Sequence, residues 1–164
     1  RALERRLFQN GGSPVLLDGD TLRAGLNGDL EFSAKDRSEN IRRLAEVAAH
    51  LARNGHIAIV AAVSPSTEDR AAARRIAGDL FREIYIATPA DVCESRDPKG
   101  HYAKARAGNL TGFTGIGNDY QAPHASELTI DTSHRAIAEA TGDITRMLSR
   151  TGVLLDTVAD LAAS

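Results

Sequence analysis

The stretch LLDGDTLRAGLNGDLEFSAKDRSENIRRLAEVA, residues 16–48, carries the pattern on which the fold prediction depends. Its first apolar residues continue from Val15 and are typical of a short buried strand, which ends at the Asp-Gly-Asp sequence of residues 18–20. Further along, Ser33 precedes a long run with apolar residues at helical spacing, so we expect it to cap a helix over residues 34–54. A strand followed by such a helix predicts an α/β unit.

The same alternation extends in both directions from this stretch. Residues 1–10 have the spacing of a helix, and the apolar run HIAIVAAV at residues 56–63 is typical of a strand buried on both faces. The remaining expected elements are a helix at 67–79, a strand at 81–87, a short helix ending near 94, a strand at 128–130 and a helix at 134–149. Strands that alternate with helices predict a doubly wound α/β fold with a parallel sheet.

Length and composition indicate one globular domain over residues 1–164. The net charge of −2 does not favour a nucleic-acid-binding protein, and no apolar run approaches the roughly 20 residues of a membrane span. Cys93 is the single cysteine, so no internal disulfide is possible and a reducing, cytoplasmic compartment is favoured. We interpret Cys93 as a packed small apolar residue rather than a nucleophile.

Residues 96–123 differ from the rest of the chain, because glycine and charge are dense there and no period is sustained. A segment of this length without a regular pattern is typical of a mobile functional lid. Its basic residues Lys99, Lys104 and Arg106 have two interpretations. They form a solvated surface, or they neutralise charge on phosphoryl oxygens beneath the lid.

Ligands of open parallel sheets bind at the carboxyl ends of the strands, and three such ends carry polar groups here. They are residues 18–20, 64–66 and 88–89. The Asp-Gly-Asp sequence is compatible with an ordinary turn or helix cap. It is equally compatible with one carboxylate that holds Mg²⁺ through water and one that accepts a hydroxyl proton.

Two long blocks resemble the adenylylsulfate kinase family. Residues 16–48 resemble the family pattern LDGDN-x-R-x-GLN-x-DLGFS-x-x-DR-x-ENIRR, and RDPKGHYAKARAGNLTGFTGIGNDYQAP, residues 96–123, resembles its lid. Val63-Ser64-Pro65 stands between them, similar to the family's Ile-Ser-Pro. The resemblance implies a fold of the P-loop nucleoside-triphosphate kinase type. The activity it implies is ATP-dependent phosphorylation of the 3′-hydroxyl of adenosine 5′-phosphosulfate, giving 3′-phosphoadenylylsulfate in sulfate assimilation.

The resemblance also implies roles for individual residues. The family positions that hold adenylylsulfate are matched by Asp20, Arg23, Phe32, Arg37, Asn40, Val63, Ser64, Lys99, Gly112 and Phe113. Among them, Phe32 and Phe113 would stack on the two faces of the adenine, although core packing is the ordinary role of a phenylalanine. Arg23 and Arg37 suit the phosphosulfate, because an arginine fork donates paired hydrogen bonds to planar anions.

The expected catalytic residues are Asp18, Asp20, Ser64 and Lys99. Asp20 would accept or orient the hydroxyl proton, and Asp18 would belong to the shell of a Mg²⁺ ion. Ser64 matches a serine that can become phosphorylated in the family, which would give a phosphoenzyme. A hydrogen bond to the substrate is the simpler role, because in-line transfer needs no covalent step. The residues assigned to ATP are Arg106, Thr132 and Arg135. Of the helical arginines that follow Asn40, we interpret Arg43 as part of a solvated face.

Departures from the family pattern qualify this reading. No G-x-x-G-x-G-K-[ST] motif, the P-loop that cradles ATP phosphates, occurs in the 164 residues. We expect that the sequence begins inside the domain and that the P-loop lies upstream. The alternative is a catalytically inactive module that binds adenylylsulfate. Smaller departures are Glu31, Asn109 and Gly117, each of which would weaken substrate affinity or lid closure.

Other small-molecule kinases, such as gluconate or antibiotic kinases, form a third possibility. Two rings for one adenine argue against it, because those substrates would not need them. The resemblance also implies a homodimer and a fusion or association with ATP sulfurylase. We expect no nucleic-acid partner and no membrane association.

Overall fold

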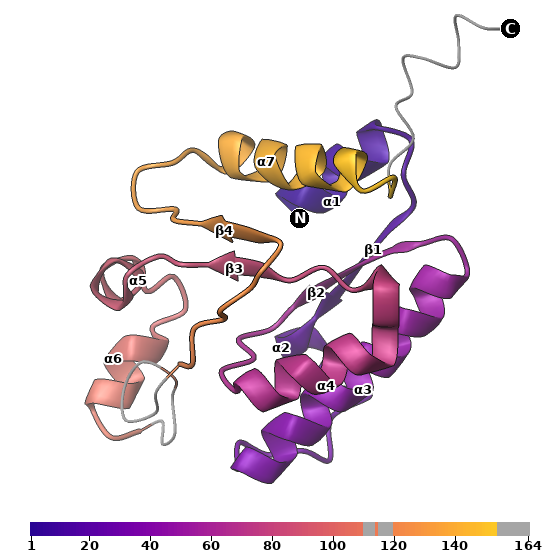
Figure 1. Ribbon diagram of the computed structural model, residues 1–164. Helices are drawn as coiled ribbons and strands as arrows, with labels where there is room; N and C mark the ends of the chain where they lie inside the picture. Colours follow the sequence, from indigo (N-terminus) through magenta and orange to yellow (C-terminus); the bar gives the residue numbers. More distant parts are fainter. Residues whose placement is uncertain (110–113, 115–119, 154–164) are drawn as a thin grey trace, which may run out of the picture.

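The computed structural model describes residues 1–109, 114 and 120–153, in which helices and strands alternate (Figure 1). The helices are α1 (Ala2–Gln9), α2 (Gly19–Leu22), α3 (Ala34–Arg53), α4 (Thr67–Ala77), the 3-10 helix η1 (Gly78–Leu80), α5 (Ala90–Arg96), α6 (His101–Arg106) and α7 (Ile137–Arg150). The strands are β1 (Pro14–Asp18), β2 (Ile57–Ala61), β3 (Ile84–Ile86) and β4 (Leu128–Ile130).

All strand pairing among the described residues is parallel. β1 pairs with β2, with Asp18 opposite Ala61 at the carboxyl end, and β3 pairs with β4, with Ile86 opposite Ile130. The predicted α/β class with parallel strands is confirmed. The structure differs in one respect, because the described strands form two separate pairs, β1-β2 and β3-β4, rather than one continuous sheet.

A largely apolar cavity of about 660 Å³ separates the two strand pairs. Its lining includes Ile59 of β2 and Ile84 of β3, together with Leu7 of α1 and Ile144 of α7. No described strand occupies this space, so the two strand pairs are joined through the helices that cover them rather than by ladder hydrogen bonds.

Helices lie on both faces of the strands, as a doubly wound fold requires (Figure 1). On one face, α1 packs against α7, where Leu7, Ile144 and Leu148 form a cluster with Ile130 of β4. On the other face, α3 packs against α4, and fully buried Leu44 is part of a second cluster. Burying a side chain such as leucine contributes roughly 1.5–3 kcal/mol, so these two clusters hold the layers together.

Local sequence signals set the ends of the long helices. The Ser33 hydroxyl accepts a hydrogen bond from the Asp36 backbone N–H at 3.1 Å, which confirms Ser33 as the cap of α3. Ser66 caps α4 in the same way through the Asp69 N–H at 3.3 Å. After α3, Gly55 adopts a φ of 85°, a conformation that glycine reaches without a steric penalty.

The segment 96–123 contains one helix that the sequence did not predict, the six-residue α6. The Asp97 carboxylate accepts hydrogen bonds from the backbone N–H groups of Tyr102 at 3.2 Å and Ala103 at 3.1 Å. This side chain supplies partners that a short helix lacks at its start. A helix this short shows too little periodicity to be read from apolar spacing.

Candidate functional site

The Asp-Gly-Asp sequence stands where β1 ends and α2 begins. Asp18 Oδ1 accepts hydrogen bonds from the backbone N–H groups of Asp20 at 3.0 Å and Thr21 at 3.1 Å. The backbone donor of Thr21 is the main reason that the pKa of Asp18 lies below its usual value, with smaller contributions from Asp20 and Lys99. Asp18 is therefore an ionised cap at neutral pH, and the capping role that the sequence left open is realised.

The turn after β2 lies against this cap. A Cβ on Gly19 would come 3.2 Å from the carbonyl oxygen of Ala61, so the two chain segments approach more closely there than most side chains permit. Beyond β2, Val63 is 62% exposed, and Ser64 has a φ of 45°, the left-handed region. The carboxyl ends of β1 and β2 therefore bring residues 18–20 and 63–64 to one edge, which accounts for two of the three strand ends singled out from the sequence.

Arg23 and Phe32 contact each other across the loop after α2. The Arg23 guanidinium lies 4.5 Å from the centroid of the Phe32 ring and donates to the backbone carbonyls of Leu30 at 3.2 Å and Glu31 at 3.1 Å. Phe32 is 57% exposed, so it is not a core residue. One face of an exposed ring is thus covered by a guanidinium, an arrangement that favours flat, anionic ligands.

Arg37 on α3 joins this loop to the segment 96–123. Its Nε donates to the Phe32 carbonyl at 3.0 Å, and its Nη1 donates to the Thr114 hydroxyl at 3.2 Å. The guanidinium therefore fixes the backbone that carries the exposed ring. Through Thr114 it also contacts the 96–123 segment, which the sequence analysis interpreted as a lid.

Lys99 reaches the Asp-Gly-Asp sequence from the segment 96–123. Its Nζ lies 2.5 Å from Asp20 Oδ2, although the two residues are 79 positions apart in the chain. The hydrogen bond to the Asp20 carboxylate raises the pKa of Lys99, with a smaller contribution from Asp18. Both side chains are mostly exposed, at 60% and 67%, so solvent screens this ion pair and either partner can be displaced by a ligand.

Asn40 was assigned to the substrate from the sequence, but it is buried rather than open to a ligand. It is 6% exposed, and its Oδ1 accepts a hydrogen bond at 2.9 Å from Nδ2 of Asn27, which is fully buried. Asn27 was not singled out from the sequence. The hydrogen bond holds the loop that carries Arg23 against α3 and satisfies Nδ2 of Asn27, whereas the buried Oδ1 of Asn27 has no hydrogen-bond partner among the described residues.

Arg43 is not the solvated surface residue that the sequence favoured, and this reading is corrected. It donates two hydrogen bonds to Asp29, at 2.6 and 2.8 Å, and one to Glu39 at 2.9 Å. It also donates to the Leu26 carbonyl at 3.0 Å. Its guanidinium ties the loop before Phe32 to α3, a role that no spacing in the sequence reveals.

The residues assigned to ATP have separate partners in this structure. Arg106 pairs with Glu94 at 2.8 Å, and Arg135 pairs with Asp143 at 2.5 Å. The Thr132 hydroxyl lies 2.6 Å from that of Thr88. The three residues are thus not gathered into one cluster by shared contacts.

Arg96 is a neighbour of Thr132 that the sequence reading missed. It donates to the Thr132 hydroxyl at 3.0 Å and to the Thr132 carbonyl at 2.7 Å. The only available signal was its position as the first residue of the 96–123 block. Gly112 and Phe113 lie outside the described residues.

No group of three or more histidine, cysteine, aspartate or glutamate side chains that could hold a metal ion occurs in ranges 1–109 and 120–153.

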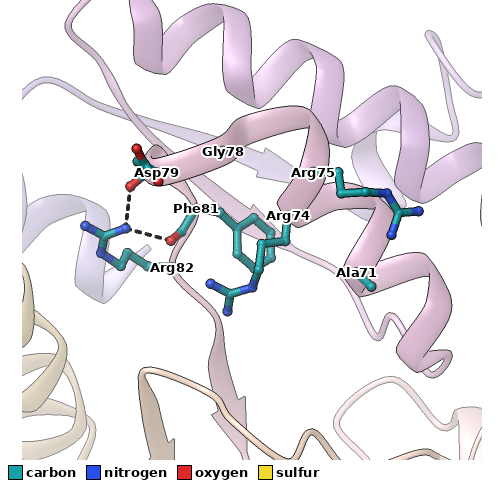
Figure 2. Close-up of a pocket in the computed structure, with 7 residues that line it drawn as sticks. All are labelled: Ala71, Arg74, Arg75, Gly78, Asp79, Phe81 and Arg82. Atoms are coloured by element: carbon teal, nitrogen blue, oxygen red, sulfur yellow. Dashed lines mark hydrogen bonds between the residues drawn. The ribbon is translucent and has the colours of Figure 1, made fainter.

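An open hollow of about 630 Å³ lies at the end of α4, next to η1 (Figure 2). It is lined by Ala71, Arg74, Arg75, Gly78, Asp79, Phe81 and Arg82. None of these is a predicted site residue, so we place the functional site at the strand ends instead. No helix of the described chain is long and apolar enough to cross a membrane.

Fold and geometry together define an α/β domain with parallel strands and a group of charged side chains at the carboxyl ends of β1 and β2, the edge at which this class of fold binds ligands. A profile of the adenylylsulphate kinase family matches residues 1–131. The adenylyl-sulfate kinase of Clostridium acetobutylicum is 51% identical over 131 residues, which cover 80% of this chain and 66% of that protein. The bifunctional enzyme CysN/CysC of Mycobacterium tuberculosis is 49% identical over 149 residues, covering 89% of this chain and 24% of that protein.

Solved structures give the same result. The APS kinase CysC of Mycobacterium tuberculosis, in complex with AMPPNP and APS, matches with a TM-score of 0.87 at 48% identity, covering 90% of this chain and 87% of that one. A hexameric APS kinase from Thiobacillus denitrificans matches with a TM-score of 0.69 at 33% identity, covering 94% of this chain and 26% of that one. The chain belongs to the adenylylsulphate kinase family. It spans 66% of the length of the relative from Clostridium acetobutylicum and 24% of the length of the bifunctional relative from Mycobacterium tuberculosis.

Proposed function

We propose that the protein catalyses ATP-dependent phosphorylation of the 3′-hydroxyl of adenosine 5′-phosphosulfate, giving 3′-phosphoadenylylsulfate in sulfate assimilation. The observation that carries the proposal is the contact between Lys99 and Asp20 at 2.5 Å. It brings a cation from the 96–123 segment to a carboxylate at the end of β1. Phosphoryl transfer depends mainly on positioning and on charge stabilisation, and this pair supplies one group for each purpose.

In this proposal Asp20 accepts or orients the proton of the attacking hydroxyl. The carboxylate is 67% exposed on its side chain and is held by an exposed lysine, so an incoming hydroxyl can take the place of that lysine. Lys99, once displaced, turns its ammonium toward the oxygens of the transferring group. Ser64, at the adjacent turn, hydrogen-bonds the substrate.

Asp18 would hold a Mg²⁺ ion, whose charge would neutralise phosphate oxygens. The fit rests on two observations: Asp18 has a lowered pKa, and both of its backbone hydrogen bonds go to Oδ1. A single carboxylate is sufficient, because Mg²⁺ usually keeps several waters and is completed by substrate phosphates.

Adenylylsulfate would bind between the loop of residues 23–37 and the 96–123 segment. Phe32 offers an exposed ring for the adenine, and Arg23 and Arg37 offer guanidinium groups beside it. Stacking on an aromatic ring contributes about 1–3 kcal/mol per base. Val63, Gly112 and Phe113 complete the assignment to the substrate, and Asn40 contributes by fixing the loop.

The assignment of Arg106, Thr132 and Arg135 to ATP is part of the same proposal. Arg106 and Arg135 are exposed arginines with carboxylate partners, and exposed pairs of this kind are weak enough to exchange for a phosphate. We add Arg96, because it holds both the hydroxyl and the carbonyl of Thr132. The segment 96–123 would act as the lid that excludes water.

We further propose a cytoplasmic homodimer that is fused to or associated with ATP sulfurylase. The lone Cys93 supports a reducing compartment. The fused relative from Mycobacterium tuberculosis supports the association. The relative from Thiobacillus denitrificans is described as hexameric, so the oligomeric state must be measured directly.

The test is chromatographic. The full-length protein is incubated with Mg-ATP and adenylylsulfate, and the products are separated to detect 3′-phosphoadenylylsulfate. Its formation is expected. Binding of adenylylsulfate without any product would support the inactive binding module instead, and the absence of both binding and product would contradict the assigned site.

A further inference from the structure

Arg70 on α4 is a buried cation at the border of the candidate site. It is 7% exposed, and arginine is seldom buried at this level unless it is paired. Its Nε lies 2.8 Å from Oε1 of Glu83, and its guanidinium lies 5.4 Å from the centroid of the Tyr120 ring. The charge is thus compensated, and the remaining N–H groups are available to other partners.

Those N–H groups hold two backbone carbonyls from distant parts of the chain. Arg70 Nη1 donates to the Ser64 carbonyl at 2.7 Å, and Nη2 donates to the Gln121 carbonyl at 2.6 Å. One planar fork therefore joins the turn after β2 to the end of the 96–123 segment. Lysine cannot reproduce this geometry, because it offers a single ammonium in place of a rigid fork.

The turn that Arg70 holds is strained. Ser64 has a φ of 45°, in the left-handed region where a side chain with a Cβ is disfavoured. Such a conformation persists only where its surroundings fix it. The hydrogen bond from Arg70 to the Ser64 carbonyl is one such constraint.

Gln121 makes two further contacts with the same turn. Its backbone N–H donates to the Pro65 carbonyl at 3.0 Å, and its side-chain Oε1 accepts from the Thr67 N–H at 2.8 Å. Thr67 in turn accepts a hydrogen bond at its hydroxyl from Arg70 Nη2 at 3.2 Å. The turn, the start of α4 and residue 121 thus form one hydrogen-bonded junction around Arg70.

We propose that Arg70 is a positioning residue that couples the conformation of the Ser64 turn to the anchored end of the 96–123 segment. The proposal rests on the proposed function, since the turn and the segment are there assigned to adenylylsulfate. Arg70 sets the geometry of both sides of the site through their backbones and does not itself contact the substrate.

Arg74 provides a matched control one helical turn away. It lies on α4, approaches Glu83 at 3.7 Å and Glu127 at 2.7 Å, and stacks over Phe81 at 4.7 Å, next to the hollow of Figure 2. Its partners therefore resemble those of Arg70 in kind. Among the described residues, its partners include neither the Ser64 turn nor Gln121.

The experiment compares Arg70→Lys with Arg74→Lys in the full-length protein. Arg70→Lys keeps a cation beside Glu83, so we expect it to fold. Without ligand, the backbone amides of Thr67 and Gln121 should exchange hydrogen about 10-fold faster than in the wild type, because their junction opens more often. With substrates, kcat/KM for adenylylsulfate should fall about 100-fold, mainly through KM, while KM for ATP changes little. Arg74→Lys should leave all of these values near those of the wild type.

Gln121→Ala serves as a second variant, because it removes only the acceptor for the Thr67 N–H and leaves the buried charge in place. It should accelerate exchange at Thr67 and raise KM for adenylylsulfate in the same direction by a smaller factor. Wild-type exchange and wild-type KM in both variants would overturn the proposal. If the wild-type enzyme forms no product, the proposed function fails, whereas exchange in the unliganded protein still decides the coupling by Arg70.

Discussion

The two sides of the candidate site are built differently. Charged side chains of the 18–43 segment are tied to backbone carbonyls, as Arg23 and Arg43 are, and a buried asparagine pair lies beneath them. The 96–109 segment is anchored at its first residue, where Arg96 donates to the Thr132 carbonyl, but further along it Lys99 and Arg106 form exposed ion pairs, with Asp20 and Glu94. Backbone-anchored contacts fix a geometry, whereas exposed ion pairs contribute about 0–1 kcal/mol and exchange readily. We therefore propose one preformed side and one side that moves when the ligand binds.

The largest expected effect comes from the contact that joins the two sides. Asp20→Asn removes both the partner of Lys99 and the proposed acceptor of the hydroxyl proton. We expect kcat to fall about 100-fold or more, with a smaller change in adenylylsulfate affinity. Steady-state kinetics with calorimetric binding would measure both quantities. Asp91→Asn, an exposed carboxylate change on α5, is the control, and equal activity of the two variants would contradict the role of Asp20.

A smaller effect, on affinity for adenylylsulfate, is expected from Arg37 in the 18–43 segment. Arg37→Ala removes the donor to the Phe32 carbonyl and a guanidinium proposed to face the phosphosulfate. Affinity for adenylylsulfate should fall by about 10- to 100-fold, since hydrogen bonds to charged groups contribute about 1.5–3 kcal/mol. Arg42→Ala, an exposed arginine on the same helix, is the comparison. Unchanged affinity in Arg37→Ala would remove the 18–43 segment from the substrate site.

The rigidity of the fixed side can be tested without any ligand. Asn27→Ala leaves the buried Oδ1 of Asn40 without its donor, and we expect the free energy of unfolding to fall by about 1–3 kcal/mol. Urea denaturation of the full-length protein would measure it. Asn10→Ala, an exposed change at the end of α1, should have little effect. A stability loss no larger than in that control would mean that the asparagine pair does not hold the loop.

The smallest effect concerns pH. Hydrogen bonds from Arg42 and then Arg43 lower the pKa of Glu39 from 4.5 to about 2. A carboxylate with a lowered pKa in the folded state stabilises the protein above its unfolded pKa, and this contribution is lost as the pH falls from about 4.5 to about 2. Glu39→Gln should therefore flatten the fall of stability in that window, as followed by thermal unfolding. If stability falls with decreasing pH equally in the variant and the wild type, solvent screening leaves these ion pairs without a net contribution to stability.

The sequence predicted the helices and strands well where periodicity or a cap was present. Ser33 and Gly55 marked the ends of α3, and the apolar runs marked β1 and β2. It did not predict α6, because six residues show too little periodicity. It also did not predict that the described strands form two separate pairs, because the order of strands in the chain does not determine which strands are neighbours in space.

For the site, the sequence pointed to residues that the structure brings together at the ends of β1 and β2, but not to what holds them, and the residues that it assigned to ATP are not gathered by shared contacts. The family pattern pointed to Asp20, Phe32 and Lys99, and the structure brings Lys99 to Asp20. The supporting residues Asn27 and Arg70 were missed, because burial and backbone partners decide their roles and neither is visible in the order of residues.

The most direct test of the account is hydrogen exchange of the full-length protein with and without adenylylsulfate. Peptides from residues 18–43 should be protected before the ligand is added and change little. Peptides from residues 96–109 should exchange readily in the free protein and become protected when adenylylsulfate binds. Protection of the 96–109 peptides that is already complete without ligand, or that does not respond to it, would contradict a site with one fixed side and one moving side.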